Sequence, residues 1–474
     1  MNYIAELVDN DGKPAGPQVS IPAEISVKQL NEILNQYLKN EEENPYSFYI
    51  NDEQIVGNLE SITQDISSEK VLRILYRPES VFGIRPVSFC SASLPGHSHI
   101  ILCISYSSDG QELATGGGDG TIIFWDVLTQ TLKQRITLST NAWIQCIQWH
   151  PHHKIVATAG TDGMVKVLYQ NKNGEFYIKS QFKVGSSPVL ALEWEPFHLH
   201  KSEFPRLACT TKKGDVAIYC SSSGSRLVST SGHQAEVMGL AWDGKGRIFT
   251  ASHDRTVKAW DSETGEQLGI FQTQSGAWRT LAISSAWVLK TGGYTLGELV
   301  LPDPKEAALK RYKDHLAQSP NEIIAVGGED FTITLMKFGK DFQSIARITG
   351  HTKSVNHVLF SPNGYWLASA SFDKTVKLFD GKTGKFVCTL GKGRWKKNTG
   401  SHMGAVYRLA WSSDSRLLLS GSEDTTNKVW DIAKQQLLKD LPGHEDVVYA
   451  VDWSPSGGRA ASGGKDKIVR LWAA

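Results

Sequence analysis

Long apolar runs are missing from this chain of 474 residues, and so is any excess of one charge, since 50 Lys and Arg face 49 Asp and Glu. No stretch approaches the roughly 18 uninterrupted apolar residues that a membrane-spanning helix needs, so we expect no membrane partner. The N-terminal residues MNYIAELVDNDG contain neither a basic segment nor an apolar core of the secretory type, and we expect no secretion signal there. With 40% apolar residues, the chain still has ample material for folded domains.

Cysteine is scarce, and its spacing follows no pattern. Without a C-x-x-C pair, the cysteines indicate neither a disulfide framework nor a zinc site. The histidine-rich tracts HPHHK (150–154) and HLHK (198–201) have no carboxylate or cysteine at ligand spacing, so we predict no metal site in them. The sequence also lacks a Gly-rich phosphate loop, a nucleophile elbow and a clustered carboxylate pair, which argues against an enzyme. The six cysteines are Cys90, Cys103, Cys146, Cys209, Cys220 and Cys388.

A repeat occupies most of the chain. Segments such as LATGGGDGTIIFWD (113–126), FTASHDRTVKAWD (249–261) and LLSGSEDTTNKVWD (418–431) place a small or hydroxyl residue four positions before an Asp and an aromatic residue six positions after it. Most intervals between these positions span 41 to 51 residues, which is the period of the WD40 repeat with its four short strands. We therefore predict a mainly β fold with an eight-bladed WD40 β-propeller over residues 96–474. The repeated position falls at Asp119, Asp162, Lys213, Asp254, Asp330, Asp373, Asp424 and Asp466.

The last repeat stops two residues after Trp472, at Ala474, and has no fourth strand of its own. The strand-like stretch VFGIRPVSFCSAS (81–93) lies before the first Gly-His pair and has no other role. We predict that it completes the eighth blade, because ring closure removes exposed strand edges. Residues 79–95 are then a linker followed by this closing strand.

A set of His, Ser or Thr, Asp and Trp residues invites comparison with a catalytic triad, but it recurs nearly whole in four repeats. An active site does not need four copies. A buried carboxylate is costly unless its acceptor sites are filled, so we interpret the set as a structural hydrogen-bond network. The four sets are His97, Thr115, Asp119 and Trp125; His233, Thr250, Asp254 and Trp260; His402, Ser420, Asp424 and Trp430; and His444, Ser462, Asp466 and Trp472.

Residues 1–78 follow a different pattern from the repeats. A hairpin is expected around Asp11 and Gly12, and a helix over 26–40 with Ser26 and Gln29 as a capping box. Strand-like segments follow at 46–50, 54–57 and 71–78, so this part is predicted to be a small α+β ubiquitin-like (β-grasp) domain. It contains 13 acidic and 6 basic residues, against 36 acidic and 44 basic residues in 79–474, and this asymmetry suggests different partners for the two parts.

Two further segments stand out within the repeats. The interval of 76 residues between Asp254 and Asp330 predicts an insertion at about 294–322, which reads as an amphipathic helix on the propeller rim. Its apolar residues are Ala307, Leu309, Tyr312 and Leu316. The second segment is a basic cluster that could bind RNA phosphates while its indole stacks on a base; an ordinary solvated loop is the alternative. The cluster comprises Lys392, Arg394, Trp395, Lys396 and Lys397.

The combination of a ubiquitin-like domain with eight WD40 repeats resembles the Notchless family of ribosome-assembly factors. SHMGAVYRLAWSSDSRLLLSGSEDTTNKVWDI (401–432), GHTKSVNHVLFSPNGYWLASASFDKTVKLFDG (350–381) and ILYRPESVFGIRPV (74–87) carry the resemblance. It implies a non-enzymatic, monomeric assembly factor of the large (60S) ribosomal subunit in the nucleolus and nucleus. The propeller would dock on pre-ribosomal RNA, ribosomal proteins and other assembly factors. A WD40 adaptor in ubiquitin or signalling pathways is the alternative function.

The resemblance also implies a motor partner. In the family, the ubiquitin-like domain engages the metal-ion-dependent adhesion site (MIDAS) of midasin, an AAA+ ATPase, and a Glu before its last strand completes the metal coordination. The matching residue here is Glu69, which we prefer over Asp65 and Glu60. Mg²⁺ favours hard oxygen ligands, so a carboxylate presented in trans can replace one of its waters. No cofactor is expected on this chain itself, and Mg²⁺ would be shared at the partner interface.

Overall fold

A computed structural model describes residues 2–8, 14–22, 25–38, 46–50, 53–55, 71–78, 84–201, 204–230, 232–273, 276–292, 294, 303–318, 322–391 and 400–474. The chain divides into two compact units, Met1–Ile84 and Arg85–Ala474, whereas the sequence analysis placed the boundary after residue 78. Within the described ranges, no helix is both long enough and apolar enough to span a bilayer.

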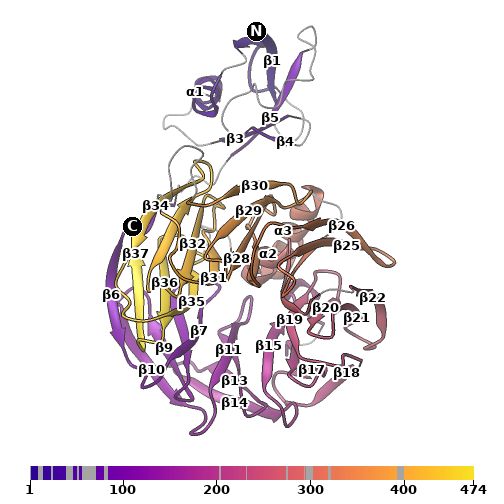
Figure 1. Cartoon of the computed structure of the whole chain (residues 1–474), viewed down its shortest axis with the longest axis vertical. Helices are drawn as coiled ribbons and strands as arrows, with labels where there is room; N and C mark the ends of the chain where they lie inside the picture. The colour runs from indigo at the N-terminus through magenta and orange to yellow at the C-terminus, as the bar shows by residue number, and fades with distance from the viewer. Residues whose placement is uncertain are drawn as a thin grey trace. The chain divides into compact units, whose positions relative to one another are not determined.

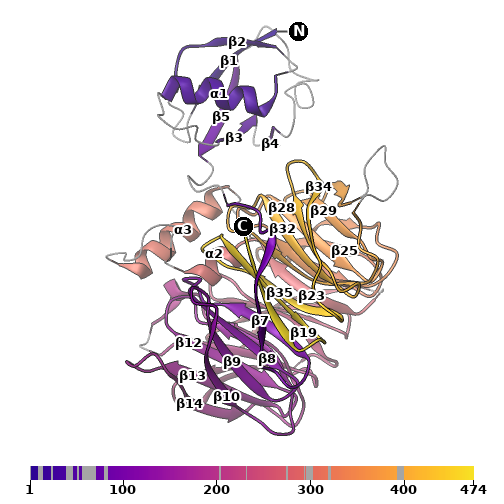
Figure 2. The same ribbon diagram turned by 90° about the vertical axis from the view of Figure 1, so that its left-hand side faces the viewer.

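The first unit is a five-stranded sheet crossed on one face by helix α1 (Val27–Leu38) (Figure 2). The strand order is β2-β1-β5-β3-β4, with β5 parallel to β1 and antiparallel to β3. This arrangement is the predicted β-grasp fold. The strands are β1 (Asn2–Val8), β2 (Val19–Pro22), β3 (Tyr46–Ile50), β4 (Glu53–Gln54) and β5 (Leu72–Pro78).

Local sequence signals account for the start and the orientation of α1. The Ser26 N–H donates to Gln29 Oε1 at 3.0 Å, and the Gln29 N–H donates to Ser26 Oγ at 3.4 Å, which confirms the predicted capping box. Leu30 and Leu34 are fully buried against the sheet, where Phe48 of β3 forms part of the same core. The helical spacing of apolar residues therefore fixes which face of α1 meets the sheet.

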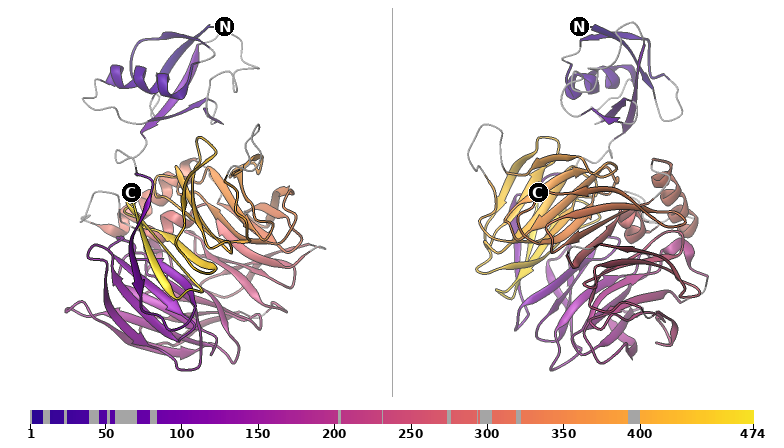
Figure 3. Two further views of the ribbon diagram at one scale, coloured as in Figure 1. Left: turned by 60° about the vertical axis from the view of Figure 1, so that its left-hand side comes forward. Right: turned by 45° about the vertical axis from the view of Figure 1, so that its right-hand side comes forward.

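The second unit consists of eight four-stranded antiparallel sheets arranged as a ring (Figure 1). Figure 3 shows successive blades fanned about one axis. In each blade the first strand lies nearest the axis and the fourth lies outermost. Blades 1 to 4 contain β7 (Ile101–Tyr106), β8 (Glu112–Gly117), β9 (Thr121–Asp126) and β10 (Thr131–Thr137); β11 (Ile144–Trp149), β12 (Ile155–Gly160), β13 (Met164–Gln170) and β14 (Phe176–Lys183); β15 (Val189–Trp194), β16 (Arg206–Thr211), β17 (Val216–Cys220) and β18 (Arg226–Thr230); and β19 (Val237–Trp242), β20 (Arg247–Ser252), β21 (Thr256–Asp261) and β22 (Gln267–Gln272).

Blades 5 to 8 continue the ring back to its starting point. They contain β23 (Trp278–Ile283), β24 (Ile323–Gly328), β25 (Ile333–Phe338) and β26 (Phe342–Ile348); β27 (Val355–Phe360), β28 (Trp366–Ser371), β29 (Val376–Asp380) and β30 (Phe386–Thr389); β31 (Val406–Trp411), β32 (Leu417–Ser422), β33 (Asn427–Asp431) and β34 (Gln436–Leu441); and β35 (Val448–Trp453), β36 (Arg459–Gly464), β37 (Ile468–Ala473) and β6 (Phe89–Pro95).

Strand β6 closes the ring by pairing antiparallel with β37, and Figure 1 shows the two lying side by side. The Ser88 N–H also donates to Ala473 O at 2.7 Å. Leu94 of β6 is buried in one core with Val469 and Leu471 of β37. The pairing runs over Phe89–Pro95, slightly later than the stretch 81–93 that the sequence suggested for this strand.

The insertion between β23 and β24 contains α2 (Ala286–Thr291), which the sequence analysis missed, and α3 (Pro304–Gln318). The expected position of α3 on the rim is wrong, because this helix lies across the strand ends on one face of the ring (Figure 2). The Tyr312 ring stacks on His198, which lies in the short helix η2 (Phe197–Leu199) of blade 3. Ala308 and Tyr312 are buried, whereas Ala307, Leu309 and Leu316 are half-buried.

Candidate functional site

The strand that follows the proposed metal-binding loop is firmly held in the first unit. Glu69 and the alternatives Asp65 and Glu60 lie outside the described residues. The described chain resumes at Val71, and Leu72 begins β5, where it pairs with Ala5 of β1. Leu72 and Ile74 are buried in the core. Strand β5 has a neighbour on both sides, so a load applied just before it would pass directly into the centre of the sheet.

The basic cluster proposed to contact RNA also lies outside the described residues; it comprises Lys392, Arg394, Trp395, Lys396 and Lys397. The described residues on either side of it belong to blades 6 and 7. Leu390 is buried and its N–H donates to Val376 O at 2.9 Å. Ser401 Oγ donates to Gly391 O at 3.3 Å, which joins the two ends of the segment. The cluster therefore lies in the sequence between β30 and β31, and the described residues Gly391 and Ser401 on either side of it are close together.

The repeated His, Thr or Ser, Asp and Trp residues meet as a chain of hydrogen bonds. In blade 4, Trp260 Nε1 donates to Thr250 Oγ1 at 2.9 Å, and His233 joins that hydroxyl to Asp254 through contacts of 2.7 Å at each ring nitrogen. Blade 6 contains the same His, Ser and Asp contacts, with Phe379 in place of the tryptophan. Equivalent chains in the other blades comprise His97, Thr115, Asp119 and Trp125; His402, Ser420, Asp424 and Trp430; and His444, Ser462, Asp466 and Trp472.

The electrostatics of these chains suit a structural role. Burial disfavours the Asp254 carboxylate, but hydrogen bonds from His233, Thr256 and the Gln234 N–H outweigh it and hold the pKa well below its usual range. Burial lowers the pKa of His402, which favours a neutral imidazole there. Thr250 is fully buried, and its oxygen already accepts the indole N–H. A hydroxyl closed off in this way cannot reach a substrate as a nucleophile.

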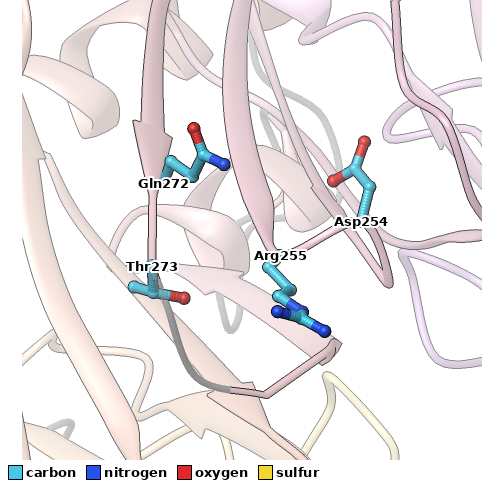
Figure 4. Close-up of a pocket in the computed structure, with 4 residues that line it drawn as sticks. All are labelled: Asp254, Arg255, Gln272 and Thr273. Atoms are coloured by element: carbon cyan, nitrogen blue, oxygen red, sulfur yellow. The ribbon is translucent and has the colours of Figure 1, made fainter.

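A shallow hollow on the surface of blade 4 is lined by Asp254, Arg255, Gln272 and Thr273 (Figure 4). Asp254 contributes no free oxygen to it, because Oδ2 accepts from His233 and the Gln234 N–H and Oδ1 accepts from both the N–H and the hydroxyl of Thr256. The backbone of Thr273 donates to Arg255 O at 3.2 Å. The Asp254 carboxylate and the Thr273 N–H are therefore engaged in hydrogen bonds within blade 4.

Sequence reasoning missed a turn conformation that all eight blades share. The residue after each repeated position has a φ between 66° and 96°, in the left-handed region. Glycine occupies it three times, and the Asp side chain often accepts the N–H two positions on, as Asp254 does from Thr256 at 2.9 Å. The eight residues are Gly120, Gly163, Gly214, Arg255, Phe331, Lys374, Thr425 and Lys467.

The two histidine-rich tracts come together beneath the insertion. His150 Nε2 lies 3.4 Å from His200 Nε2, and His150 Nδ1 accepts the N–H groups of His152 and His153. Burial lowers the pKa of His150 well below its usual range and that of His200 to about 4. Among the described residues, no three His, Cys, Asp or Glu side chains are arranged to hold a metal ion. The neutral cluster supports the insertion, since Tyr294 Oη donates to His152 O at 3.1 Å and Lys305 Nζ donates to His200 O.

Comparison with known proteins identifies both parts of the chain. The NLE (NUC135) domain matches residues 3–63, and the WD domain, G-beta repeat matches residues 88–126, 132–167, 224–261, 342–380, 394–431 and 435–473. The chain is 39% identical over 385 residues to the Notchless protein homolog of Arabidopsis thaliana, covering 80% of each chain. It is 37% identical over 372 residues to Protein Notchless of Drosophila melanogaster, covering 76% of this chain and 74% of that one. Ribosome assembly protein 4 of Saccharomyces cerevisiae is 36% identical over 404 residues, covering 80% and 77%.

Two solved structures share the propeller fold at low sequence identity. Sqt1 of Saccharomyces cerevisiae matches with a TM-score of 0.65 and 14% identity over 82% of this chain and 100% of that chain. The computationally designed Ika8 protein matches with a TM-score of 0.61 and 24% identity over 83% of this chain and 100% of that chain. At these identities the likeness concerns the fold alone.

Proposed function

This chain belongs to the Notchless family, and from that membership we propose that it is a non-enzymatic assembly factor of the large (60S) ribosomal subunit. The observation that carries the proposal is similarity along both parts of the chain to relatives that include Ribosome assembly protein 4 of yeast. The buried hydroxyls of the repeated hydrogen-bond chains support a scaffold rather than a catalyst. Its place of action is the nucleolus and nucleus, where it works as a monomer within a large particle.

The charge distribution supports a division of labour between the two parts. Residues 1–78 have a net charge of −7 and residues 79–474 have a net charge of +8, from the counts of acidic and basic residues in each. A basic surface favours association with RNA phosphates and acidic proteins. We assign docking on pre-ribosomal RNA, ribosomal proteins and assembly factors to the propeller, with the basic segment 392–397 as its candidate contact.

We assign binding of the motor protein to the acidic first unit. Glu69 provides a carboxylate oxygen to the Mg²⁺ in the MIDAS domain of midasin, in place of a water. The support for this role is the family match together with the position of Glu69, shortly before the central strand β5. Strand β5 is hydrogen bonded to both β1 and β3, so tension on the loop would act on the whole sheet rather than peel off an edge strand.

Complementation tests the assembly role. A Saccharomyces cerevisiae strain depleted of Ribosome assembly protein 4 is expected to regain free 60S subunits when this chain is expressed. The measurement is the 60S peak in a sucrose gradient, with the tagged chain sedimenting in the pre-60S fractions. A chain that is folded and abundant but never sediments with precursor particles would contradict the assembly role.

Metal-dependent capture tests the role of Glu69. The full-length chain is expected to bind the isolated midasin MIDAS domain in Mg²⁺ and to release it in EDTA. Glu69→Ala and Glu69→Gln are expected to weaken binding at least tenfold, because neither alanine nor glutamine provides a charged oxygen ligand. Asp65→Ala and Glu60→Ala are matched controls that remove the same charge from the sequence between β4 and β5. Equal losses in all four variants would point to net charge rather than coordination and would reject Glu69 as the ligand.

A further inference from the structure

An arginine projects into the axial channel of the propeller from the innermost strand of blade 7. Arg408 lies on β31, where Val406 and Leu409 are buried between neighbouring blades. The Arg408 side chain is instead exposed to solvent. Propeller blades surround a central channel, so an exposed side chain on an innermost strand faces that channel.

The groups around Arg408 come from three other blades. The positive charge of Arg408 acts on Cys103 of blade 1, Cys146 of blade 2 and His357 of blade 6. The Leu409 N–H donates to His357 Nδ1 at 3.3 Å, which ties blade 6 to the strand that carries Arg408. Contributions from both sides of the ring place the guanidinium near the axis.

None of these neighbours supplies a counter-charge. Burial raises the pKa of Cys146 to about 12, even though Arg408 lowers it, and raises the pKa of Cys103 as well. Burial also lowers the pKa of His357, so this imidazole is neutral. Among the described residues, none forms an ion pair or a side-chain hydrogen bond with the Arg408 guanidinium. The two thiols and the imidazole therefore leave the charge of Arg408 uncompensated.

The acidic residues of the innermost strands, Glu193 and Asp452, leave no negative charge for Arg408. Asp452 of β35 accepts from Lys290 Nζ at 3.3 Å and from the Tyr106 N–H at 2.9 Å. Burial raises the pKa of Glu193 on β15 to about 8, although Lys290 lowers it, so Glu193 is mostly protonated at pH 7. The charges of Lys290 and Asp452 cancel each other, so neither residue neutralises the positive charge of Arg408.

Helix α2 covers one end of the channel. Lys290 of α2 reaches Asp452 in blade 8 and influences Glu193 in blade 3. A Cβ on Gly292, which follows α2, would lie 2.9 Å from Pro151 O in blade 2. The segment that carries α2 thus contacts blades 2 and 8 besides its own, and access to Arg408 is from the opposite end of the channel.

We propose that the axial channel is an anion-binding site in which Arg408 binds one oxyanion, a phosphate or a carboxylate, that enters from the end opposite α2. A guanidinium offers a planar fork of donors that matches both groups in a bidentate geometry. Although the Arg408 side chain borders the channel, desolvation by the surrounding blades lowers its pKa, so its uncompensated charge is unfavourable there and a bound anion offsets that cost. The site depends only on the propeller and is independent of the proposed ribosomal role.

Calorimetric titration of the full-length chain with inorganic phosphate at low ionic strength tests the site. Wild type is expected to bind one phosphate saturably, and Arg408→Gln is expected to bind it at least tenfold more weakly. Arg226→Gln is the matched control, because Arg226 is an exposed arginine on the outermost strand β18 of blade 3. Equal binding by wild type and Arg408→Gln, or no saturable binding by wild type, would overturn the proposal.

Thermal unfolding shows whether Arg408→Gln is folded, and it distinguishes phosphate binding at Arg408 from a general effect of salt on stability. Without phosphate, Arg408→Gln is expected to unfold at the same temperature as wild type or higher, because an unpaired charge has been removed. Phosphate should raise the unfolding temperature of wild type and of Arg226→Gln, but not that of Arg408→Gln. A lower unfolding temperature for phosphate-free Arg408→Gln would show that Arg408 already has a partner, which would refute the site.

A second titration distinguishes the two sources of the anion. The probe is an acetylated and amidated tri-glutamate peptide, added alone and in competition with phosphate. Displacement of phosphate by the peptide, absent in Arg408→Gln, would support a carboxylate from a partner chain. Phosphate binding that the peptide cannot displace would support a free phosphate group as the occupant. Peptide binding that persists unchanged in Arg408→Gln would count against the channel as its site.

Discussion

At the scale of single residues, the repeated aspartates of blades 1, 4, 7 and 8 terminate chains of hydrogen bonds that begin at a tryptophan. In blades 1, 4, 7 and 8 the chain satisfies an indole N–H, a hydroxyl and an imidazole that burial would otherwise leave without partners. Removing one member exposes the others to the full cost of desolvation, which is about 1 to 3 kcal/mol for a neutral group. The aspartate also accepts backbone N–H groups in its own turn, so it links the turn to the blade interior.

Asp254→Ala is expected to lower the free energy of unfolding by roughly 1 to 3 kcal/mol, because His233 and two backbone N–H groups lose their acceptor. Urea unfolding followed by tryptophan fluorescence measures the change. Glu266→Ala is the matched control, since Glu266 is an exposed acid in the same blade. Stability equal to wild type in Asp254→Ala would remove the structural explanation of the repeated aspartate.

Gly120→Ala is expected to destabilise the chain by at least about 1 kcal/mol, because φ is +70° there and a Cβ would overlap Ser139 O. Gly458→Ala provides the control, since a Cβ at Gly458 would meet no atom within 4 Å and φ lies outside the left-handed region. Urea unfolding of the two variants should differ clearly. Similar midpoints for both would show that the left-handed turn is not required.

At the scale of secondary-structure elements, α3 is held to the propeller by one narrow face. Tyr312 lies so close to Gly244 in the β19–β20 turn that a Cβ there would overlap its ring, and it stacks on His198. Arg311 joins α3 to the α2 segment by donating to Gly292 O at 2.7 Å and to Thr291 Oγ1 at 3.1 Å. These contacts explain why the insertion is an integral part of the ring face.

Tyr312→Ala is expected to release α3 and to destabilise the insertion by about 3 kcal/mol, the usual order for removing a buried aromatic side chain. Limited proteolysis should then cut within residues 304–318 much faster than in wild type. Lys313→Ala is the control, because its side chain is exposed on the adjacent position of the helix. Unchanged proteolysis of Tyr312→Ala would mean that other contacts hold the helix.

At the scale of the whole molecule, ring closure depends on a strand that precedes the first repeat. A fragment of residues 85–474 keeps β6 and is expected to unfold cooperatively near the temperature of the propeller in the full chain. A fragment of residues 97–474 lacks β6 and exposes the edge of β37, so it should unfold at a markedly lower temperature or aggregate. Calorimetry compares the two, and equal unfolding temperatures would show that β6 is dispensable.

The buried histidine cluster makes stability depend on pH. The pKa of His200 is about 4 in the fold, below its unfolded value near 6.5, so unfolding takes up a proton between these values. Stability conferred by the neutral imidazole is present above pH 6.5 and is lost as pH falls toward 4, by up to about 1.4 kcal/mol per pH unit. His200→Gln should flatten the stability profile over this window, and His99→Gln, at an exposed histidine, should not. Parallel profiles for wild type and His200→Gln would contradict this assignment.

The sequence by itself determined the features that arise from contacts close along the chain. The repeat period predicted eight blades of four strands, because each unit contains its own alternating strands and turns. Ser26 and Gln29 predicted the start of α1, because a capping box needs only four consecutive residues. The closing strand was also predictable, since the last repeat is visibly one strand short.

Only the tertiary structure decided which distant residues share an environment. The histidine tracts at 150–154 and 198–201 meet because blades 2 and 3 are neighbours, and the spacing within each tract does not encode that contact. The choice of Ala308 and Tyr312 rather than Ala307 and Leu309 as the buried face of α3 depends on the ring surface beneath it. Arg408 likewise looks ordinary in its repeat. Its lack of a partner follows from the uncharged side chains that blades 1, 2 and 6 place around it, and ring closure alone brings those together.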